Sequence, residues 1–567
     1  MVLRFSARIA YVVFVVALVG MFSGASLEAK NFEEVLNDIA DERVQQAQDQ
    51  IKVRGKEIDW PGICSASKDA VIQIFSHTND YPIFAPYKTP DRSGGCGTGF
   101  LISDDGYILT NFHVVEEAVV LRVQFPSLGK DNFQVELVGC CPDRDVALLR
   151  LVPTALENIK ALMGVESLPY LTLGNSDLLG HGDHVLVLGY PQSNLKLGME
   201  NLKSSIGDYS GKESLSIGEC IQTSTPVNPG NSGGPFFDAA GRVTGMCVLK
   251  DFSAEGLAYM IPINNVKLLL KNLAVNKIVR LPQWGLTVIP TTAGSSKARG
   301  FPADGGVAIT AVSKGSLFHE HGIEKGDVLY EINGVKLDRY GYMNVAWSKD
   351  KTYFEDVLAR FDIDTVVPVT IYRDGGLQVI NLTITCKRQE AIDWFYPWID
   401  RDLGYEVLAG MVVVELTLNH LEIFKKIEAR KTMRSSDFRS PYILRYGATN
   451  NRQEPRLFVS EFFPDSQIYK AIHKSDVSEM FDFVISKVNG IPVKTIDDFR
   501  NAVRASIGKE FLTVETEGGA FVDLSIEELL KEEDALAATY GFEKSGLMTE
   551  LEQGFTYDQS SGNLALA

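Results

Sequence analysis

From residue 70 to residue 263 the chain is a series of short runs rich in β-branched and large apolar residues. Turn signals such as Asp104-Asp105-Gly106 separate these runs, and no helical period is evident between them. Many short strands at this spacing are typical of a β-barrel or a β-sandwich. About 200 residues of strand without intervening helices favour a two-barrel domain over an α/β hydrolase.

A glycine-rich stretch lies inside this region, where residues 221–235 read I-Q-T-S-T-P-V-N-P-G-N-S-G-G-P. Gly230, Gly233 and Gly234 flank Ser232, so the backbone can turn sharply and neighbouring amides can converge on one point. That geometry suits acyl transfer. The same composition is also typical of an ordinary loop. The catalytic interpretation therefore needs a base and an orienting acid elsewhere in the chain.

Two upstream residues supply this pair. His113 follows a predicted strand in T-N-F-H, and Asp145 precedes another in D-R-D-V-A-L. A single histidine is more often structural than catalytic, and the chain has eight. The order His113, Asp145, Ser232 is what favours a catalytic triad over three unrelated residues.

Three motifs carry a family resemblance: G-T-G-F-L-I-S-D-D-G-Y-I-L-T-N-F-H-V-V at residues 97–115, D-R-D-V-A-L-L-R at 143–150 and N-P-G-N-S-G-G-P at 228–235. Together they closely resemble the HtrA (Deg, or protease Do) family of trypsin-like serine proteases. The resemblance is strong over residues 71–263 and weak after residue 410. It implies a mainly β protein, in which a trypsin-like double β-barrel precedes a PDZ domain and a divergent second PDZ-like domain.

The resemblance also assigns roles to single residues. Ser232 is expected to be the nucleophile, His113 the general base and then acid, and Asp145 the residue that orients the imidazole. A serine hydroxyl is a poor nucleophile unless a base removes its proton. The backbone of Gly230, Asn231 and Ser232 is expected to form the oxyanion hole.

Substrate preference is expected from the residues before the nucleophile. In trypsin-like folds the residue six positions upstream lies at the base of the specificity pocket, and here it is Pro226, followed by Val227. Neither is acidic, so cleavage after medium-sized apolar residues is expected. A distant carboxylate reaching the pocket is the alternative. Residues 192–216 and 250–256 depart from the family pattern in loops that order the oxyanion hole in relatives, which favours latent or regulated activity.

After residue 281 the sequence resembles a PDZ domain, with I-E-K-G-D-V-L-Y-E-I-N-G at residues 323–334. In the family, the loop at Trp284, Gly285 and Leu286 receives the terminal carboxylate of a peptide, which adds a strand to an exposed sheet edge. A purely bracing role is the alternative. The insertion at residues 340–350 argues against an open groove.

A fainter repeat begins at residue 410, and its peptide groove is predicted to be altered or lost. S-I-E-E at residues 525–528 predicts a final helix to about residue 539, followed by an unstructured tail from residue 554. Tyr81, Phe84 and Tyr87 are candidates either for trimer contacts or for ordinary packing. The aromatic and acidic residues from 392 to 405 are expected to pack between domains.

The first 29 residues predict export, because basic Arg4 and Arg8 precede an apolar run and then small residues. Cleavage is favoured over an uncleaved anchor, and both place the protein outside the cytoplasm, in the periplasm or otherwise exported. The net charge of -18 and the pI near 5.0 argue against nucleic acid as a partner. Seven cysteines without a C-x-x-C pattern predict free thiols, with a Cys220–Cys247 pair as an alternative.

The predicted function is that of an exported, ATP-independent serine endopeptidase that degrades unfolded or damaged proteins and uses no metal or cofactor. A homo-oligomer, a trimer or a multiple of trimers, is expected. The alternatives are a latent protease that acts as a chaperone or binding protein, and a dedicated processing protease. The predicted divisions are a signal peptide (1–29), an N-terminal helical segment (30–65), the protease domain (66–275), PDZ domain 1 (281–390), PDZ-like domain 2 (402–523), and a C-terminal helix with a flexible tail (524–567).

Overall fold

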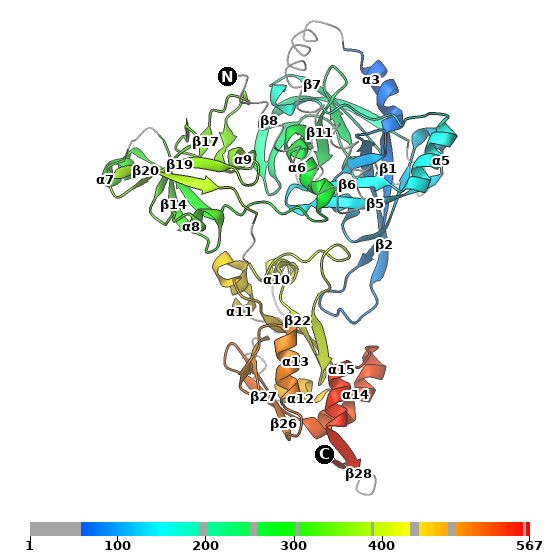
Figure 1. The fold of residues 1–567 in the computed structure, drawn as a ribbon, viewed down its shortest axis with the longest axis vertical. Coiled ribbons are helices and arrows are strands. Elements are labelled where there is room, and N and C mark those ends of the chain that lie inside the picture. Colours follow the sequence, from blue (N-terminus) through cyan, green and yellow to red (C-terminus); the bar gives the residue numbers. More distant parts are fainter. Residues whose placement is uncertain are drawn as a thin grey trace, which may run out of the picture.

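The computed structural model describes residues 58–191, 201–248, 258–301, 305–386, 390–430, 441–473, 483–558 and 563–566. The predicted signal peptide and most of the predicted N-terminal helical segment lie outside these residues, which begin just before α3 (Trp60–Ser67). Three bodies follow in chain order. The first body consists of two barrels, a first sheet domain lies beside it, and a second sheet domain lies below (Figure 1). In the described ranges no helix is long and apolar enough to cross a bilayer.

The first barrel is closed by six antiparallel strands in the order β1-β2-β3-β6-β5-β4. Its interior holds fully buried apolar side chains, among them Phe100, Ile108 and Leu149. Each such side chain stabilises the fold by about 1.5–3 kcal/mol. The strands are β1 (Val71–Asp80), β2 (Asp91–Leu101), β3 (Tyr107–Thr110), β4 (Ala118–Gln124), β5 (Asn132–Cys141) and β6 (Val146–Leu151).

The second barrel is also closed, in the order β10-β11-β12-β9-β8-β7, and helix α6 (Ile263–Val275) follows it. The mainly β class and the double barrel are therefore confirmed. The strands are β7 (His184–Gly189), β8 (Lys203–Leu215), β9 (Gly218–Thr223), β10 (Pro235–Phe237), β11 (Val243–Val248) and β12 (Ala258–Pro262).

Two local expectations in this region were wrong. Helix α5 (Pro153–Met163) joins the barrels, where no helix was expected. This helix begins at Pro153 and is capped at its C-terminus by Gly164, whose φ is 69°. Ala155 and Ile159 are the buried residues on one face of the helix. Residues 192–216 were expected to be a loop, but residues 203–215 form β8, the longest strand of its barrel. Their Ser-, Lys- and Gly-rich composition hid a strand that backbone pairing with β7 and β9 stabilises. Residues 192–200 and 249–257 lie outside the described part.

The first sheet domain has the strand order β13-β14-β15-β19-β20, so that β13 is an edge strand. Helices α7 (Ala293–Arg299), α8 (Leu317–Glu320) and α9 (Phe354–Leu358) accompany the sheet. The predicted insertion at residues 340–350 contains β17 (Tyr342–Met343), which pairs with β18 (Thr352–Tyr353). The strands are β13 (Leu286–Pro290), β14 (Val307–Val312), β15 (Val328–Ile332), β16 (Val335–Lys336), β19 (Val366–Arg373) and β20 (Gly376–Thr383).

The second sheet domain repeats this plan with one added strand, in the order β21-β22-β23-β24-β26-β27, with β25 (Ile491–Pro492) beside β24. Gly285 before β13 and Gly410 before β22 occupy matching places, since a Cβ on either glycine would lie within 2.2 Å of a serine Cβ. The strands are β21 (Tyr405–Leu408), β22 (Met411–Glu415), β23 (Leu457–Phe462), β24 (Val484–Val488), β26 (Phe511–Thr516) and β27 (Phe521–Ser525).

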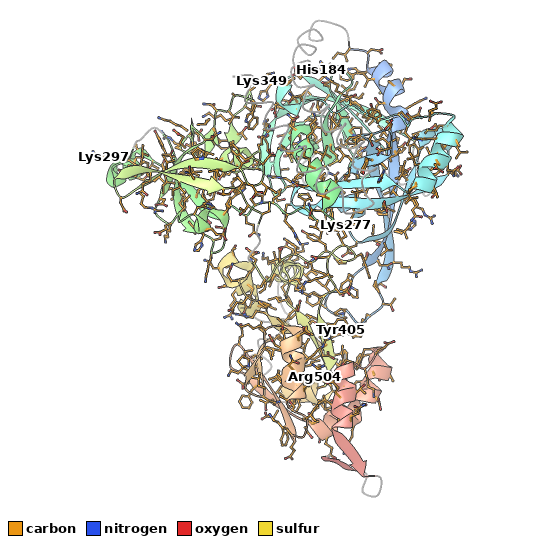
Figure 2. All side chains as sticks on the ribbon, in the orientation of Figure 1. His184, Lys277, Lys297, Lys349, Tyr405 and Arg504 are labelled. Carbon is orange, nitrogen blue, oxygen red and sulfur yellow. The ribbon has the colours of Figure 1, made fainter. Side chains whose placement is uncertain are left out.

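Strand β21 covers the edge of β22 that corresponds to the free edge of β13. Arg500 on helix α13 (Ile496–Arg504) fastens it, donating to Glu406 Oε2 at 2.7 Å and to Tyr405 O at 3.1 Å. Figure 2 labels Tyr405 in this lower body, together with Arg504 at the end of α13. This edge of the second sheet is thus covered by the chain itself.

The C-terminal region was predicted too simply. Helix α14 (Ile526–Tyr540) begins as expected, with Ser525 Oγ accepting the Glu528 amide. Instead of an unstructured tail, helix α15 (Gly546–Gln553) and a hairpin of β28 (Phe555–Asp558) and β29 (Asn563–Leu566) follow. The composition here is rich in turn-forming and polar residues, so it did not indicate strands. The two four-residue strands β28 and β29 pair with each other.

A buried carboxyl group on α14 leads to a stability prediction. Glu533 is fully buried, and burial raises its pKa to about 8. The folded state therefore binds a proton that the unfolded chain releases near pH 4.3, and stability falls as pH rises from about 4.3 to 8. We expect Glu533→Gln to raise the melting temperature at pH 8 and to flatten its decline between pH 5 and 8.

The measurement is a series of calorimetric scans at several pH values. Glu510→Gln, at an exposed position of the same domain, is the control and should follow the wild type. If the melting temperatures of Glu533→Gln and wild type decline in parallel with pH, the buried carboxyl is not the cause.

The segment at residues 392–405 packs between domains, as predicted. The Tyr396 ring lies 5.5 Å from the ring of Phe112 in the first barrel. Trp398 Nε1 donates to Asn79 O at 3.0 Å. In the described part of the chain no cysteine forms a disulfide, and Cys220 and Cys247 are not joined, so the alternative pair is not formed.

Candidate active site

The predicted base and acid meet in the first barrel. His113 lies on the short helix α4 (Phe112–Val115), immediately after β3, and Asp145 precedes β6. His113 Nδ1 is 2.8 Å from Asp145 Oδ2, and the His113 amide donates to Asp145 Oδ1 at 2.9 Å. Both oxygens of the carboxylate therefore face the histidine and fix the orientation of its ring.

Asp145 is held in an uncommon backbone conformation. It ends the turn Pro142–Arg144 with φ 55° and ψ 43°, in the left-handed region, and only 4% of its surface is exposed. A residue other than glycine adopts this conformation at a cost that its surroundings must offset. Asn111 contributes, because its Nδ2 donates to Asp145 O at 3.0 Å.

Ser232 lies in the second barrel, in the loop between β9 and β10, and strand β2 connects this loop to the first barrel. The Thr98 amide donates to Ser232 O at 2.9 Å, and Thr98 Oγ1 donates to Gly230 O at 2.7 Å. A Cβ on Gly233, whose φ is 83°, would lie 2.1 Å from Thr98 O, so only glycine fits there. The serine loop is thereby fixed at the junction of the two barrels.

Some backbone amides of the serine loop donate hydrogen bonds within the fold, and others do not. Asn231 N–H donates to Asn228 O at 3.0 Å, so this member of the predicted oxyanion hole is already engaged. Among the described residues no acceptor takes the N–H of Gly230 or Ser232. These two amides are thus not committed to the fold, as the donors of an oxyanion hole must be. Their role in an oxyanion hole stays a prediction.

The two predicted specificity residues lie beside the loop. Pro226 is exposed, and Val227 is half-buried against the apolar cluster of the second barrel that includes Tyr209 and Met260. The role of Pro226 and Val227 in specificity stays a prediction.

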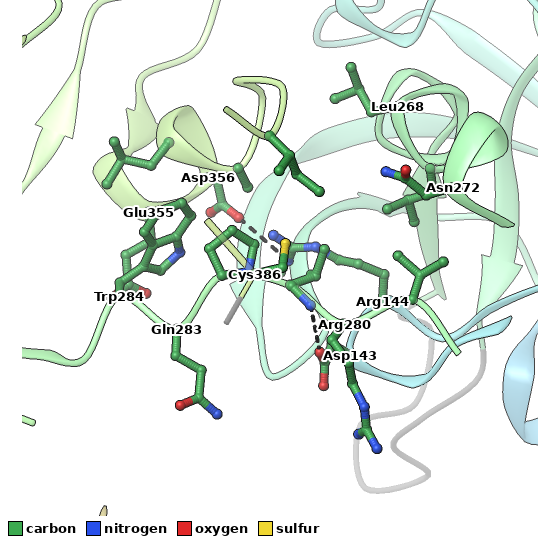
Figure 3. A pocket seen from close by; sticks show the side chains of 18 of the residues that line it. Asp143, Arg144, Leu268, Asn272, Arg280, Gln283, Trp284, Glu355, Asp356 and Cys386 are labelled. Carbon is green, nitrogen blue, oxygen red and sulfur yellow. Dashed lines mark hydrogen bonds and ion pairs between the residues drawn. The ribbon is translucent and has the colours of Figure 1, made fainter. Parts of the chain in front are cut away.

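Trp284, Gly285 and Leu286 lead into the edge strand β13. Gly285 has φ 72°, and its carbonyl accepts the Ser313 amide at 2.8 Å. Beside Trp284 is a cavity of about 400 Å³ at the meeting point of the domains (Figure 3). Its walls include Arg144 and Arg280 from the protease side, Glu355 and Leu358 from α9, and Cys386 from the connecting segment.

One titratable group of this cavity is strongly perturbed. Burial, with a smaller contribution from the neighbouring Asp356, raises the pKa of Glu355 to about 7, and Arg144 opposes the shift. The approach of α9 to the turn before Asp145 was not foreseen from the sequence. Nothing in the residue order indicates that a helix of one domain lies against a turn of another.

The aromatic loop between β1 and β2 contacts the third body of the same chain. The Tyr81 ring lies 5.3 Å from Phe395, and the Phe84 ring lies 5.1 Å from the buried His420. Tyr87 packs against the same apolar cluster as Phe84. Burial lowers the pKa of His420 to about 4, which keeps its ring neutral beside the loop. These contacts agree with the packing alternative for Tyr81, Phe84 and Tyr87.

Several known proteins are similar to this chain. Residues 97–246 match the family described as "Trypsin-like peptidase domain". The chain is 32% identical over 281 residues to the putative serine protease HhoB of Synechocystis, covering 45% of this chain and 62% of that protein. It is 31% identical to a probable periplasmic serine endoprotease DegP-like of Chlamydia trachomatis and 26% identical to the periplasmic serine endoprotease DegP of Escherichia coli.

These last two matches cover 53% and 52% of this chain, and 55% and 58% of the relatives. The chain thus spans less than two thirds of the curated relatives it matches. Among solved structures, an HtrA-type protease AlgWS227A with tripeptide is 22% identical with a TM-score of 0.44, over 58% of this chain and 98% of that one. Residues 97–246 therefore form a trypsin-like peptidase domain, and the chain is similar to serine proteases described as HhoB and DegP.

Proposed function

We propose that the protein is an exported, ATP-independent serine endopeptidase that degrades unfolded or damaged polypeptides. The observation that carries this proposal is the buried Asp145 carboxylate, with both oxygens directed at His113, which lies across the barrel junction from the Ser232 loop. Export rests on the sequence of residues 1–29 and on relatives that are named periplasmic. A homo-oligomer built of trimers belongs to the same proposal.

The proposed reaction has two halves. Ser232 Oγ attacks the carbonyl carbon of the peptide bond while His113 Nε2 takes the hydroxyl proton. The N–H groups of Gly230 and Ser232 stabilise the oxyanion. His113 then returns the proton to the departing amine, and the C–N bond breaks to leave an acyl-enzyme. Water, activated by His113, releases the acid and restores Ser232.

Polypeptide chains with medium-sized apolar side chains are the proposed substrates. Pro226 and Val227 place no charge beside the serine loop, and a Lys or Arg side chain of the substrate would have no carboxylate there to pair with. A protein that exposes apolar segments only when unfolded would then be cleaved mainly in that state.

A labelling experiment tests the proposal. A fluorophosphonate reacts only with an activated serine, so the purified full chain should be labelled at Ser232 and should lose casein digestion in step with labelling. A protein that digests casein without labelling, or is labelled elsewhere, contradicts it. A protein that neither labels nor digests casein but prevents aggregation of unfolded substrate supports the chaperone alternative. Cleavage of one native protein while casein stays intact supports the processing protease.

A second proposed activity is peptide binding by the first sheet domain. Among the described strands its edge strand β13 pairs only with β14, and Leu286 and Val288 are half-buried towards the domain core. A peptide can therefore add a strand there, with its terminal carboxylate at the turn of Trp284 and Gly285. We expect a peptide with an apolar C-terminus to bind at least about tenfold more tightly as the free acid than as the amide.

Fluorescence polarisation with the two peptides measures this difference. Leu286→Asp should weaken binding of the free acid, whereas Val379→Asp, at an apolar position 65% exposed on the opposite edge strand, should not. Equal binding of acid and amide would instead support a purely bracing role for the domain.

A further inference from the structure

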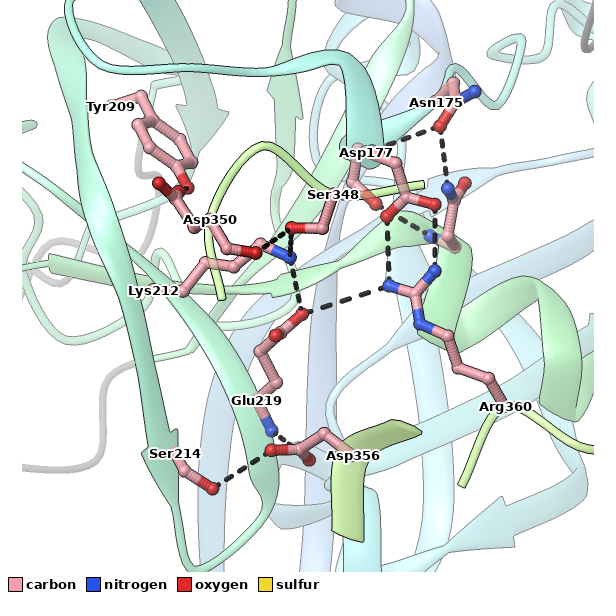
Figure 4. Close-up of polar contacts among 12 residues, drawn as sticks. Asn175, Asp177, Tyr209, Lys212, Ser214, Glu219, Ser348, Asp350, Asp356 and Arg360 are labelled. Atoms are coloured by element: carbon pink, nitrogen blue, oxygen red, sulfur yellow. Dashed lines mark hydrogen bonds and ion pairs between the residues drawn. The ribbon is translucent and has the colours of Figure 1, made fainter. Parts of the chain in front are cut away.

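The first sheet domain is joined to the second barrel by a network of buried polar groups (Figure 4). Lys212 Nζ on β8 lies 2.9 Å from Glu219 Oε1 on β9, within the barrel. Arg360, which follows α9, makes a two-pronged contact with Asp177 at 2.8 and 2.9 Å. Such paired, charge-assisted contacts fix the relative position of the two domains.

Asp356 on α9 is a member of this network that also approaches the residue before Asp145. Its side chain is 8% exposed. Asp356 Oδ1 accepts the Glu219 amide at 2.9 Å, and Oδ2 accepts Ser214 Oγ at 3.1 Å. Its Oδ1 is also 3.9 Å from Arg144 Nη1. One carboxylate of the first sheet domain thus contacts both strands of the β8–β9 hairpin and the residue before Asp145.

Arg144 connects the hairpin to the turn that carries Asp145. Its Nη1 donates to Ile217 O at 2.9 Å, and its side chain is 15% exposed. A Cβ on Gly218 would lie 1.4 Å from this nitrogen, so the guanidinium lies directly against bare backbone. Arg144 is therefore fixed at its far end, while its backbone leads straight into the left-handed Asp145.

We propose that Arg144 and Asp356 are positioning residues for the triad: through them the docked first sheet domain holds the turn that orients Asp145 towards His113. This inference rests on the proposed serine protease function. Neither residue contacts the reacting atoms, so each acts through Asp145. Small displacements of an orienting group are costly in catalysis, because the base must stay aligned with the nucleophile.

The same interface provides a matched control. Asp177 contacts Arg360 across the domain boundary, as Asp356 contacts the hairpin, but it lies in the turn Ser176–Leu178 rather than beside residues 142–145. Asp177→Asn therefore weakens docking without removing a contact to Arg144. Arg360 also lies 3.9 Å from Glu219 Oε1, so substituting Asp177 is cleaner than substituting Arg360.

The experiment compares the full-length wild type with Arg144→Ala, Asp356→Ala, their double variant and Asp177→Asn. We expect each Ala variant to lower kcat for a fluorogenic peptide about tenfold with KM within about twofold. The rate of fluorophosphonate labelling should fall in parallel, since labelling depends on the triad. The double variant should lose little more than either single variant, because both act on one turn. Asp177→Asn should retain kcat within about twofold.

Arg144→Lys retains a hydrogen-bond donor, and Asp356→Asn retains an acceptor. Each should therefore have a higher kcat than the corresponding Ala variant, and each replaces that variant in the comparison if the Ala variant does not fold. Unchanged kcat and labelling in the Arg144 and Asp356 variants, with an active wild type, would overturn the positioning role. An equal loss in Asp177→Asn would also overturn it, in favour of docking as a whole. A wild type that neither cleaves nor labels would overturn the proposed function itself.

Discussion

Ser232→Ala should lower kcat for peptide hydrolysis by about 10⁶-fold, because the hydroxyl that forms the acyl-enzyme is absent. The variant should still cleave slightly faster than the uncatalysed reaction in water, because the N–H groups of residues Gly230 and Ser232 remain available to stabilise an oxyanion. The fold should be retained, because the Thr98 amide donates to the Ser232 carbonyl, and alanine keeps this backbone contact. The measurement is the rate of casein or fluorogenic-peptide cleavage by protein purified free of other proteases.

Ser210→Ala is the control for this variant. Ser210 lies exposed on β8 of the same barrel, and its hydroxyl donates to the nearby Asp208 carbonyl at 3.5 Å. It should cleave at the wild-type rate. If Ser232→Ala and wild type cleave equally, the serine protease proposal is wrong, and any activity in the preparation has another source.

Asp145→Asn should lower kcat at neutral pH by about 10⁴-fold. Asparagine has nearly the same shape, so the left-handed turn can persist, but its NH₂ group can donate to His113 Nδ1. The imidazole would then carry its proton on the nitrogen that should accept the serine proton. The free enzyme would hold the wrong tautomer, and Ser232 would have no base.

Asp143→Asn is a closely matched comparison, because Asp143 belongs to the same turn but accepts the Leu281 amide at 3.2 Å. It should change kcat by no more than a few-fold. Fluorophosphonate labelling of Ser232 should slow with Asp145→Asn and not with Asp143→Asn. A similar loss in both variants would mean that the turn as a whole, rather than the Asp145 carboxylate, supports activity.

The residues of the candidate site could be predicted from sequence to the extent that local motifs encode them. His113, Asp145 and Ser232 each lie in a run whose pattern is readable in one dimension, and the structure brings His113 and Asp145 to 2.8 Å. Arg144 and Asp356 are different. An arginine beside an aspartate and an acidic residue on a short helix are typical of exposed surface. Their burial follows only from how two domains dock.

The fold, too, could be predicted where local sequence patterns specify it and not where it depends on contacts between distant segments. The double barrel was predictable because alternating apolar runs and turn residues specify strands locally. The assignment of residues 203–215 failed because β8 is polar along much of its length and is stabilised by pairing with β7 and β9. Strand β21 could not be foreseen either, since what covers a sheet edge depends on a hairpin formed by Ala409 and Gly410.

That hairpin has a consequence for competition between ligands. Strand β21 is tethered to the edge it covers by a two-residue turn, so its effective concentration at β22 is on the order of millimolar or higher. A free peptide would have to exceed this concentration, and also break the Arg500–Glu406 contact, before it could displace the strand. Peptides at micromolar concentrations would therefore leave the second sheet domain unoccupied.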